Sequence, residues 1–335
     1  MNAPIIKFTD EQVAFIKAER RAYNARAEQL AANSAGMIGN SLAIPIDAWR
    51  RIDARAQMLA RSRLAVFARL AAASTKPVSV ADLVNYYPQM SDSGEVVVTM
   101  DGRNSGKTDQ AITKYVGTPL PILSTGVRLG WRQMEVIRKG GNMIDTTSIA
   151  NAQRKVAEKL EDMALNGLPS VVVGSDTVYG LRTLPQRNTG NHTFTLATTA
   201  TGANWVTAFT QAINALQGDN NFGQITFFIN QGDYTAAETK DYATNYTGTI
   251  LQRLLAISKV KEIIPASNVP ANEILGVADL ETGEWGDVLS AMPMTTRAKT
   301  RLDPEDDYVF TAMAAMVPQL RADYNGQSPF VHLSQ

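Results

Sequence analysis

The sequence contains no cysteine, and its 335 residues include only two histidines, His192 and His332. The absence of cysteine excludes disulfides, thiolate metal ligands and cysteine nucleophiles. Two imidazoles are too few for a zinc site with several histidine ligands, and they argue against a Ser-His-Asp hydrolase. One histidine stands in a polar turn and the other in the C-terminal tail, so we expect both at the surface. We assign no catalytic, cofactor-binding or metal-ligating residue, and we expect that the chain is not an enzyme.

Long apolar runs are also missing. No segment has about 18 consecutive apolar residues, the length that a membrane-crossing helix needs. The chain begins MNAPIIKFTDEQ, which lacks the basic and then apolar pattern of a signal peptide. We therefore expect a soluble protein, made in the cytoplasm and not bound to a membrane. With 44% hydrophobic and 19% charged residues, the chain has a globular composition, and its length suggests about two domains.

The chain has no net charge, since 32 basic residues balance 32 acidic ones, and no strong overall field attracts nucleic acid. The distribution is uneven, however. Residues 1–76 contain twelve Lys and Arg against six Asp and Glu. A basic arm on a slightly acidic body is typical of a segment that faces a polyanion, although charge alone favours an ordinary solvated helical face.

Two helices are predicted in this arm. Thr9 begins a capping box, and Val13, Ile16 and Tyr23 follow with helical spacing. A second helix is predicted from about 47 to 72, with Trp49 at the start of its apolar stripe. Its opposite side carries five arginines: Arg50, Arg51, Arg55, Arg61 and Arg69. Such a helix suits docking onto a partner subunit or onto phosphate groups better than binding to a membrane surface.

A long β-hairpin is predicted at about 91–118. The strand-like segments EVVVTM (95–100) and AITKYV (111–116) flank the polar, glycine-containing segment DGRNSGKTDQ. Little in the flanks can bury both faces of such a hairpin. We expect that it projects from the body and packs on something else.

The hairpin tip contains Gly106-Lys107-Thr108, which matches only the end of a nucleotide-binding P-loop motif. A P-loop requires its first glycine at position 101, where this chain has Asp101. That carboxylate would also stand beside the phosphates that backbone amides should hold. A polar hairpin tip is the better interpretation. The acidic run at 303–307 lacks the spacing of a calcium-binding loop and is interpreted as a solvated turn.

The rest of the chain predicts a mixed α and β body. The clearest element is a helix at about 146–166, with apolar residues on one stripe, an Arg154–Glu158 pair at i,i+4 and Gly167 as its stop. Helices are also predicted near 203–217, 233–241 and 249–257. Strands are predicted near 127–129, 225–229, 260–264, 274–277, 284–299 and 308–317.

The segment LSTGVRLGWRQMEVIRKGGNMIDTTSIANAQRKVAEKLEDMALNG resembles the central part of tailed-phage major capsid proteins with the Hong Kong 97 fold, especially their encapsulin-like branch. In that family a strand leads into a short Arg-x-x-Glu turn, and a glycine break and "DT" precede a long spine helix. The corresponding residues here are Arg132, Glu135, Asp145, Thr146, Ala152, Val156, Ala157 and Glu161, followed by Gly167 and Tyr179-Gly180-Leu181. Ala152 stands one residue early for the strict pattern. The order of elements agrees over nearly the whole chain.

The resemblance implies an α+β Hong Kong 97-type fold in four parts. Residues 1–76 would form an N-terminal helical arm, and 77–125 an extended loop that lies over a neighbouring subunit. Residues 126–200 and 291–335 would form the peripheral domain with the spine helix, and 201–290 the axial domain. The N-terminal region is longer than an encapsulin usually carries.

The implied function is that of a major capsid protein, which self-assembles into pentamers and hexamers of an icosahedral phage head around double-stranded DNA. The same-fold alternative is the shell protein of an encapsulin-type bacterial nanocompartment, and a nucleotide-binding enzyme built around Lys107 is a distant third. The implied partners are other copies of the chain, a portal, scaffolding or decoration proteins, and DNA held non-specifically on the inner face. The protein would reside in the virion, assembled in the cytoplasm of a host bacterium. Contacts between subunits are expected at Val13, Ile16, Tyr23, Trp49, Asp101, Arg103 and Lys107, and the five arginines at 50–69 are expected on the inward basic face.

Overall fold

The structure is a computed structural model. It describes residues 17, 20–21, 65–93, 100, 110–132, 134–135, 147–244 and 246–335. Most of the two predicted helices of the arm, nearly all of the predicted strand at 95–100 and the hairpin tip lie outside these residues. Of the second helix, the structure describes α3 (Ala65–Ala73), which ends within one residue of the predicted boundary.

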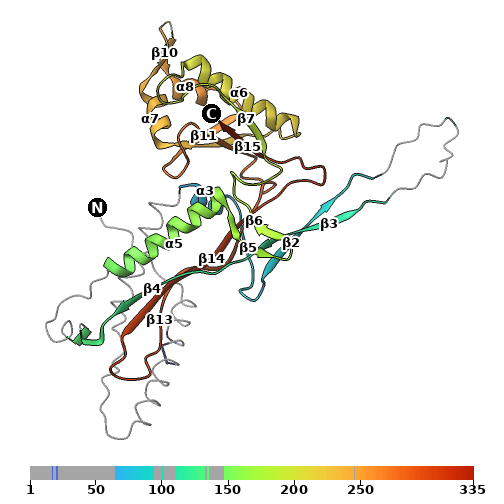
Figure 1. The fold of residues 1–335 in the computed structure, drawn as a ribbon. Helices are drawn as coiled ribbons and strands as arrows, with labels where there is room; N and C mark the ends of the chain where they lie inside the picture. Colours follow the sequence, from blue (N-terminus) through green and yellow to red (C-terminus); the bar gives the residue numbers. More distant parts are fainter. Residues whose placement is uncertain are drawn as a thin grey trace.

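The predicted spine helix is present as α5 (Thr147–Asn166), and it lies along a long four-stranded sheet (Figure 1). Its apolar stripe is buried, and the Arg154 and Glu158 side chains approach to 3.4 Å, as the spacing predicted. Gly167 ends the helix in the left-handed region at φ 71°, where a side chain would collide with the carbonyl oxygen of Val178 at 2.3 Å. The buried stripe consists of Ile149, Ala152, Val156, Leu160 and Met163.

The four-stranded sheet has the order β1-β13-β14-β4. Its two long central strands are antiparallel, and β1 adds in parallel at one edge. The strands are β1 (Thr75–Pro77), β4 (Leu123–Leu129), β13 (Gly286–Ala298) and β14 (Tyr308–Leu320). Helix α5 packs against β14 and β4, so the spine helix and this sheet form one layered unit.

A five-stranded sheet, of order β11-β8-β12-β15-β7, forms the second unit. Its strands are β7 (Asn188–Asn191), β8 (Ile225–Asn230), β11 (Val260–Ala266), β12 (Ile274–Ala278) and β15 (Phe330–Ser334). One face packs against α6 (Gly202–Gly218) and α8 (Ile250–Leu255), and α7 (Gln231–Thr239) contacts β8 and β11. The other face joins the core around α3 and α5, so the interior strand β8 is buried on both sides. A small sheet of β9 (Asp241–Ala243) and β10 (Tyr246–Thr249) precedes α8.

The composition of this sheet differs from the predicted division of the chain. Residues 188–191 and 330–334, expected in the peripheral domain, lie in the same sheet as strands from 201–290. Conversely, β13 begins at Gly286 and belongs to the four-stranded sheet. The reason is tertiary: Val331 and Leu333 fill the core beneath α6, and no local pattern in a five-residue strand reveals its partner.

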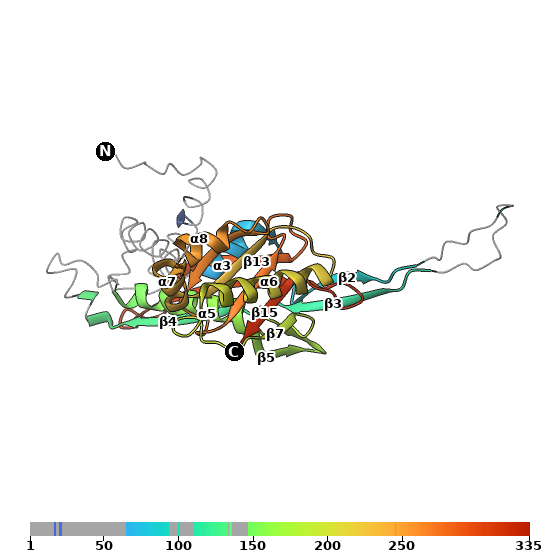
Figure 2. The same ribbon diagram turned by 90° about the horizontal axis from the view of Figure 1, so that it is seen from above.

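A hairpin projects sideways from the body, and one of its strands lies before the predicted range of 91–118 (Figures 1 and 2). The strands are β2 (Val84–Met90) and β3 (Thr113–Pro119), paired antiparallel from Val84↔Pro119 to Met90↔Thr113. The sequence pattern predicted no strand at 84–90, and most of the predicted strand at 95–100 lies outside the described residues. Pro88 is tolerated in β2 because, among the strands that the structure describes, β2 pairs only with β3.

A second, shorter hairpin follows the spine helix. It consists of β5 (Leu168–Val173) and β6 (Asp176–Val178), paired antiparallel. It packs against the base of β3: the Gly117 N–H points to the Asp176 carboxylate, at 3.4 Å. A Cβ at Gly117 would lie 2.2 Å from an oxygen of that carboxylate, so this close approach requires glycine.

Candidate inter-subunit surfaces

The projecting hairpin has one exposed apolar face. Every second residue of β2 points to this face, and so does Tyr115 on β3. Tyr115 is paired directly with Pro88, and directly paired residues point the same way. We call it the hairpin patch: Tyr86, Pro88, Met90 and Tyr115. Tyr86, Met90 and Tyr115 are 55%, 64% and 67% exposed. Contiguous exposed apolar side chains of this kind mark interaction surfaces, so the patch is the first candidate interface.

The base of the hairpin is, by contrast, firmly attached to the body. Gln319 on β14 is fully buried, and its side-chain amide donates to the Asn85 carbonyl oxygen at 3.0 Å and to the Thr118 hydroxyl at 3.3 Å. The Asn85 amide donates in return to the Gln319 side-chain oxygen at 3.1 Å. Further out, the Gln89 side chain donates to the Ala322 carbonyl oxygen at 2.9 Å. The face of the hairpin that contacts the body therefore fixes its orientation, while the opposite face is exposed to solvent.

The N-terminal arm joins the body at Glu161, a residue of the spine-helix pattern. Its side chain is 1% exposed, and its two oxygens accept the backbone N–H groups of Val66 and Phe67 at 3.0 and 2.9 Å. Such N–H groups in the first turn of a helix lack partners within the helix, so a carboxylate there also interacts well with the helix dipole. Burial raises the pKa of Glu161, against the lowering effect of the two N–H groups. The spine-helix pattern includes this glutamate but gives no signal of its role.

Of the arginines predicted for the basic face, the structure describes only Arg69. Its guanidinium pairs with Glu262 and Glu281 of the same chain, and its side chain is 20% exposed. These contacts fix α3 to β11 and to the turn before β13, and the inward position expected for Arg69 stays a prediction. The other members of the two predicted sets lie outside the described residues: Val13, Ile16, Tyr23, Trp49, Arg50, Arg51, Arg55, Arg61, Asp101, Arg103 and Lys107.

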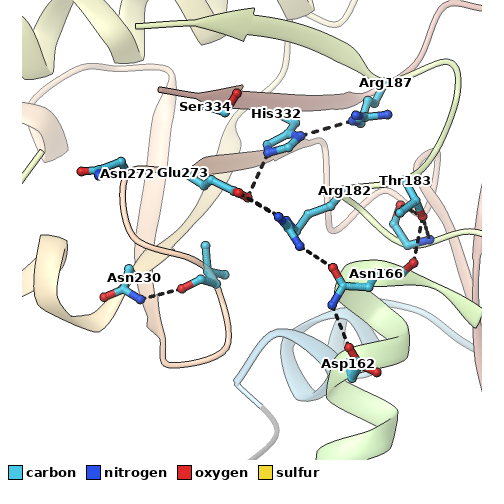
Figure 3. Close-up of polar contacts among 12 residues, drawn as sticks. Asp162, Asn166, Arg182, Thr183, Arg187, Asn230, Asn272, Glu273, His332 and Ser334 are labelled. Atoms are coloured by element: carbon cyan, nitrogen blue, oxygen red, sulfur yellow. Dashed lines mark hydrogen bonds and ion pairs between the residues drawn. The ribbon is translucent and has the colours of Figure 1, made fainter. Parts of the chain in front are cut away.

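His332 contradicts the expectation of a surface residue. It lies on β15 with a side-chain exposure of 11%, and its Nε2 is 3.0 Å from a Glu273 oxygen. The Glu273 carboxylate is also held in two places by the Arg182 guanidinium, at 2.7 and 2.8 Å (Figure 3). Burial lowers the pKa of His332, with Arg187 and Arg182 acting the same way and Glu273 acting against them.

His192 is likewise buried, at 5% exposure, contrary to the same expectation. Its Nδ1 and Nε2 lie 2.9 and 3.0 Å from the carbonyl oxygens of Phe194 and Asn272. Asp233, on α7, accepts the Asn272 N–H at 2.8 Å, and burial raises the pKa of this carboxyl against the effects of that N–H and of His192. The polar sequence around both histidines gave no signal of burial, because their neighbours in space come from distant segments.

The acidic run at 303–307 forms the solvated turn that was predicted. Asp306 accepts the N–H groups of Leu302 and Asp303, and Asp307 accepts that of Trp131 and pairs with Arg128. Across the described residues, no cluster of three or more His, Cys, Asp or Glu side chains is arranged for a metal ion. No helix in the same residues is long and apolar enough to span a membrane.

The arrangement of elements matches solved structures of shell proteins. The chain is similar to the capsid of Myoviridae phage XM1 (TM-score 0.63, 10% identity, covering 81% of this chain and 91% of that one). It is similar to a virus-like particle from Pyrococcus furiosus (TM-score 0.58, 14% identity, 85% and 98% covered). A third likeness is to the capsid of a native GTA particle (TM-score 0.55, 14% identity, 80% and 90% covered). The predicted Hong Kong 97-type fold of phage capsid proteins is thereby confirmed.

At the level of sequence the relationships are sparser. No curated protein matches the chain. One family model, described as "Family of unknown function (DUF6260)", matches residues 36–333, which is most of the chain. The protein is therefore a member of this family, and it has the fold of a phage capsid subunit.

Proposed function

We propose that the chain is a major capsid protein, which self-assembles through pentamers and hexamers into an icosahedral phage head around double-stranded DNA. The observation that carries this proposal is the hairpin patch. A rigidly based hairpin presents four contiguous residues with apolar surface to solvent, and burying them against a second copy would release that surface from water. The shell folds to which the chain is similar support the same conclusion.

In this proposal the units of the fold take separate roles. The spine helix and the four-stranded sheet form the peripheral domain, and the five-stranded sheet with α6–α8 forms the axial domain at the capsomer centres. Each subunit obtains packing for its hairpin from a neighbour, so closure is cooperative and loss of one subunit exposes several patches. The chain acts as a structural protein and not as an enzyme.

The proposed partners follow from a closed shell. They are other copies of the chain, a portal, and scaffolding or decoration proteins, within a virion assembled in the cytoplasm of a host bacterium. DNA would contact the inner face without sequence preference, through the basic arm. The likeness to a virus-like particle supports one alternative, a nanocompartment shell that holds protein cargo. Particles that enclose protein and no DNA would favour that alternative.

The test compares two neighbouring residues of β3 that lie on opposite faces of the hairpin. Tyr115→Glu places a charge in the hairpin patch, and Lys114→Glu places one on the other face, opposite Gln89. We expect that the wild type and Lys114→Glu form capsomers or closed shells in negative-stain electron microscopy, whereas Tyr115→Glu stays a folded monomer. Shells from Tyr115→Glu, or a wild type that is monomeric at every concentration, would contradict the proposal.

A further inference from the structure

The only two histidines of the chain converge on two consecutive residues. His192 contacts the carbonyl oxygen of Asn272, and His332 contacts the carboxylate of Glu273. Both contacted residues belong to the connection between β11 and β12, which runs past the end of the five-stranded sheet. The two polar networks therefore meet where this sheet faces the segment that follows the spine helix.

The hydrogen bonds around His332 assign its protonation state. The Nε–H of Arg187 points to Nδ1 of the ring at 3.3 Å, so Nδ1 must act as the acceptor. Nε2 then carries the single proton and donates it to Glu273, at 3.0 Å. Only a neutral ring, in this one tautomer, satisfies both contacts.

Glu273 connects this neutral ring to the spine helix (Figure 3). Arg182, which holds the Glu273 carboxylate with two N–H groups, also donates to the Asn166 side chain at the end of α5. Asn166 donates in turn to Asp162, one turn earlier in the helix, at 2.7 Å. A continuous chain of hydrogen bonds thus runs from β15, in the five-stranded sheet, to the last turn of the spine helix.

The second histidine fixes the same connection from its other side. Asn272 has a φ of 64°, which is unusual for a residue with a side chain, and three of its polar groups are engaged. Its N–H donates to Asp233, its carbonyl faces His192, and its side-chain oxygen accepts the Leu196 N–H at 2.9 Å. The connection is therefore anchored at Asn272, and Glu273 is presented to His332 in a defined position.

We propose that neutral His332, with Arg187, Glu273 and Arg182, forms a proton-sensitive latch that holds the five-stranded sheet against the spine helix. Protonation of Nδ1 places two donors face to face, because the Arg187 N–H still points at that nitrogen. Protonation also adds a positive charge beside two arginines, and Glu273 is the carboxylate that faces the ring and offsets part of that charge. The latch then loosens, and the sheet gains freedom relative to α5.

The direction of the pH dependence follows from the lowered pKa of His332. As pH falls, the unfolded or opened chain binds the proton more readily than the latched one does. The latch therefore contributes its full stabilisation at pH values above the ordinary pKa of histidine. This stabilisation is lost progressively as pH falls from the ordinary pKa toward the lowered pKa of His332. The charged groups that face His332 are Glu273, Arg187 and Arg182, and Asp233 is the charged group that faces His192.

Hydrogen exchange measured by mass spectrometry on the full-length protein tests the latch. Between about pH 7.5 and 5, after correction for intrinsic exchange, we expect exchange at 180–188 and 267–274 to rise about threefold to tenfold in the wild type. His332→Gln keeps a neutral donor near Glu273 and should remove this rise. Arg187→Met should remove most of it too, because no donor then points at Nδ1 and a protonated ring can keep its contact with Glu273.

His192→Gln identifies which histidine responds. It should retain the acid-induced rise, and peptides from α6 should show no comparable rise in any variant. A wild type without the rise, or a rise that persists in both His332→Gln and Arg187→Met, would overturn the proposal. A rise that disappears in His192→Gln and persists in His332→Gln would overturn it as well, because the response would belong to the other histidine.

Discussion

The five-stranded sheet and the β2–β3 hairpin bury their apolar side chains in opposite ways. All five residues of β12, and the first five of β8, are buried, because helices cover one face of the sheet and the spine-helix core covers the other. The hairpin has two strands, one face on the body and one apolar face in water. An isolated two-stranded ribbon is marginal in water, so its attachment at Gln319 is what keeps it ordered.

The difference separates the stability of the subunit from its association. Side chains in the sheet determine whether the chain folds, and a change there acts before any partner is met. Side chains of the hairpin patch contribute little to the isolated fold, and their packing depends on another molecule. The two regions should therefore respond differently to the same kind of truncation.

The largest expected effect is a truncation beneath the sheet. Phe209 on α6 is fully buried, with its ring centroid 4.6 Å from that of Phe227 on β8. We expect that Phe209→Ala lowers the free energy of unfolding by about 3–5 kcal/mol, because it removes buried apolar surface and leaves a cavity. Denaturant unfolding followed by tryptophan fluorescence measures this. A loss below about 1 kcal/mol would show that the sheet is not the stabilising unit.

A smaller effect is expected at the base of the hairpin. Gln319→Leu preserves the size of the side chain but removes the donor to Asn85 and Thr118, and it leaves the Asn85 amide without its acceptor. We expect a loss of about 2–3 kcal/mol, since buried polar groups without partners are penalised. Exchange in β2 and β3 should rise more than exchange in β8. Equal rises in both regions would mean that the base does not act on the hairpin locally.

Glu161 should have a still smaller effect, with a characteristic pH dependence. Glu161→Gln leaves one oxygen for two N–H groups of α3, and we expect a loss of about 1–2 kcal/mol at neutral pH. Because burial raises the pKa of the native carboxyl, the folded protein binds the proton more readily than the unfolded chain does.

The contribution of Glu161 to the free energy of unfolding therefore increases as pH falls from its raised pKa in the folded protein toward the ordinary pKa of glutamate. The same contribution decreases as pH rises between these two pKa values. The difference in unfolding free energy between the wild type and Glu161→Gln should widen on acidification. A difference that narrows would contradict the assigned cause. Because acidification acts on His332 in the opposite direction, the comparison is best made in a His332→Gln background.

The elements that depend on local sequence pattern could be predicted from the sequence. The spine helix followed from its apolar stripe and from Gly167, and β8 followed from the run ITFFI. The arm's junction and the latch did not follow, because Glu161, Glu273 and His332 acquire their roles from residues about 59 to 95 positions away. The strand at 84–90 was not predicted, because whether a strand tolerates Pro88 depends on which of its edges is paired. Within the hairpin patch, Tyr115 fell inside a predicted strand, whereas Tyr86, Pro88 and Met90 preceded the predicted hairpin.

The smallest expected effect on stability is the most informative about association. Tyr115→Thr replaces one strand-favouring residue by another, a β-branched one, and removes a ring that is 67% exposed, so the free energy of unfolding should change by no more than about 0.5 kcal/mol. Sedimentation at increasing concentration should nevertheless show a clear loss of capsomers or shells relative to the wild type. Phe209→Ala supplies the opposite case, with lower stability but an unaltered patch in the molecules that remain folded. If Tyr115→Thr assembled normally, the exposed face of the hairpin would be an ordinary surface, and association would have to depend on another part of the chain.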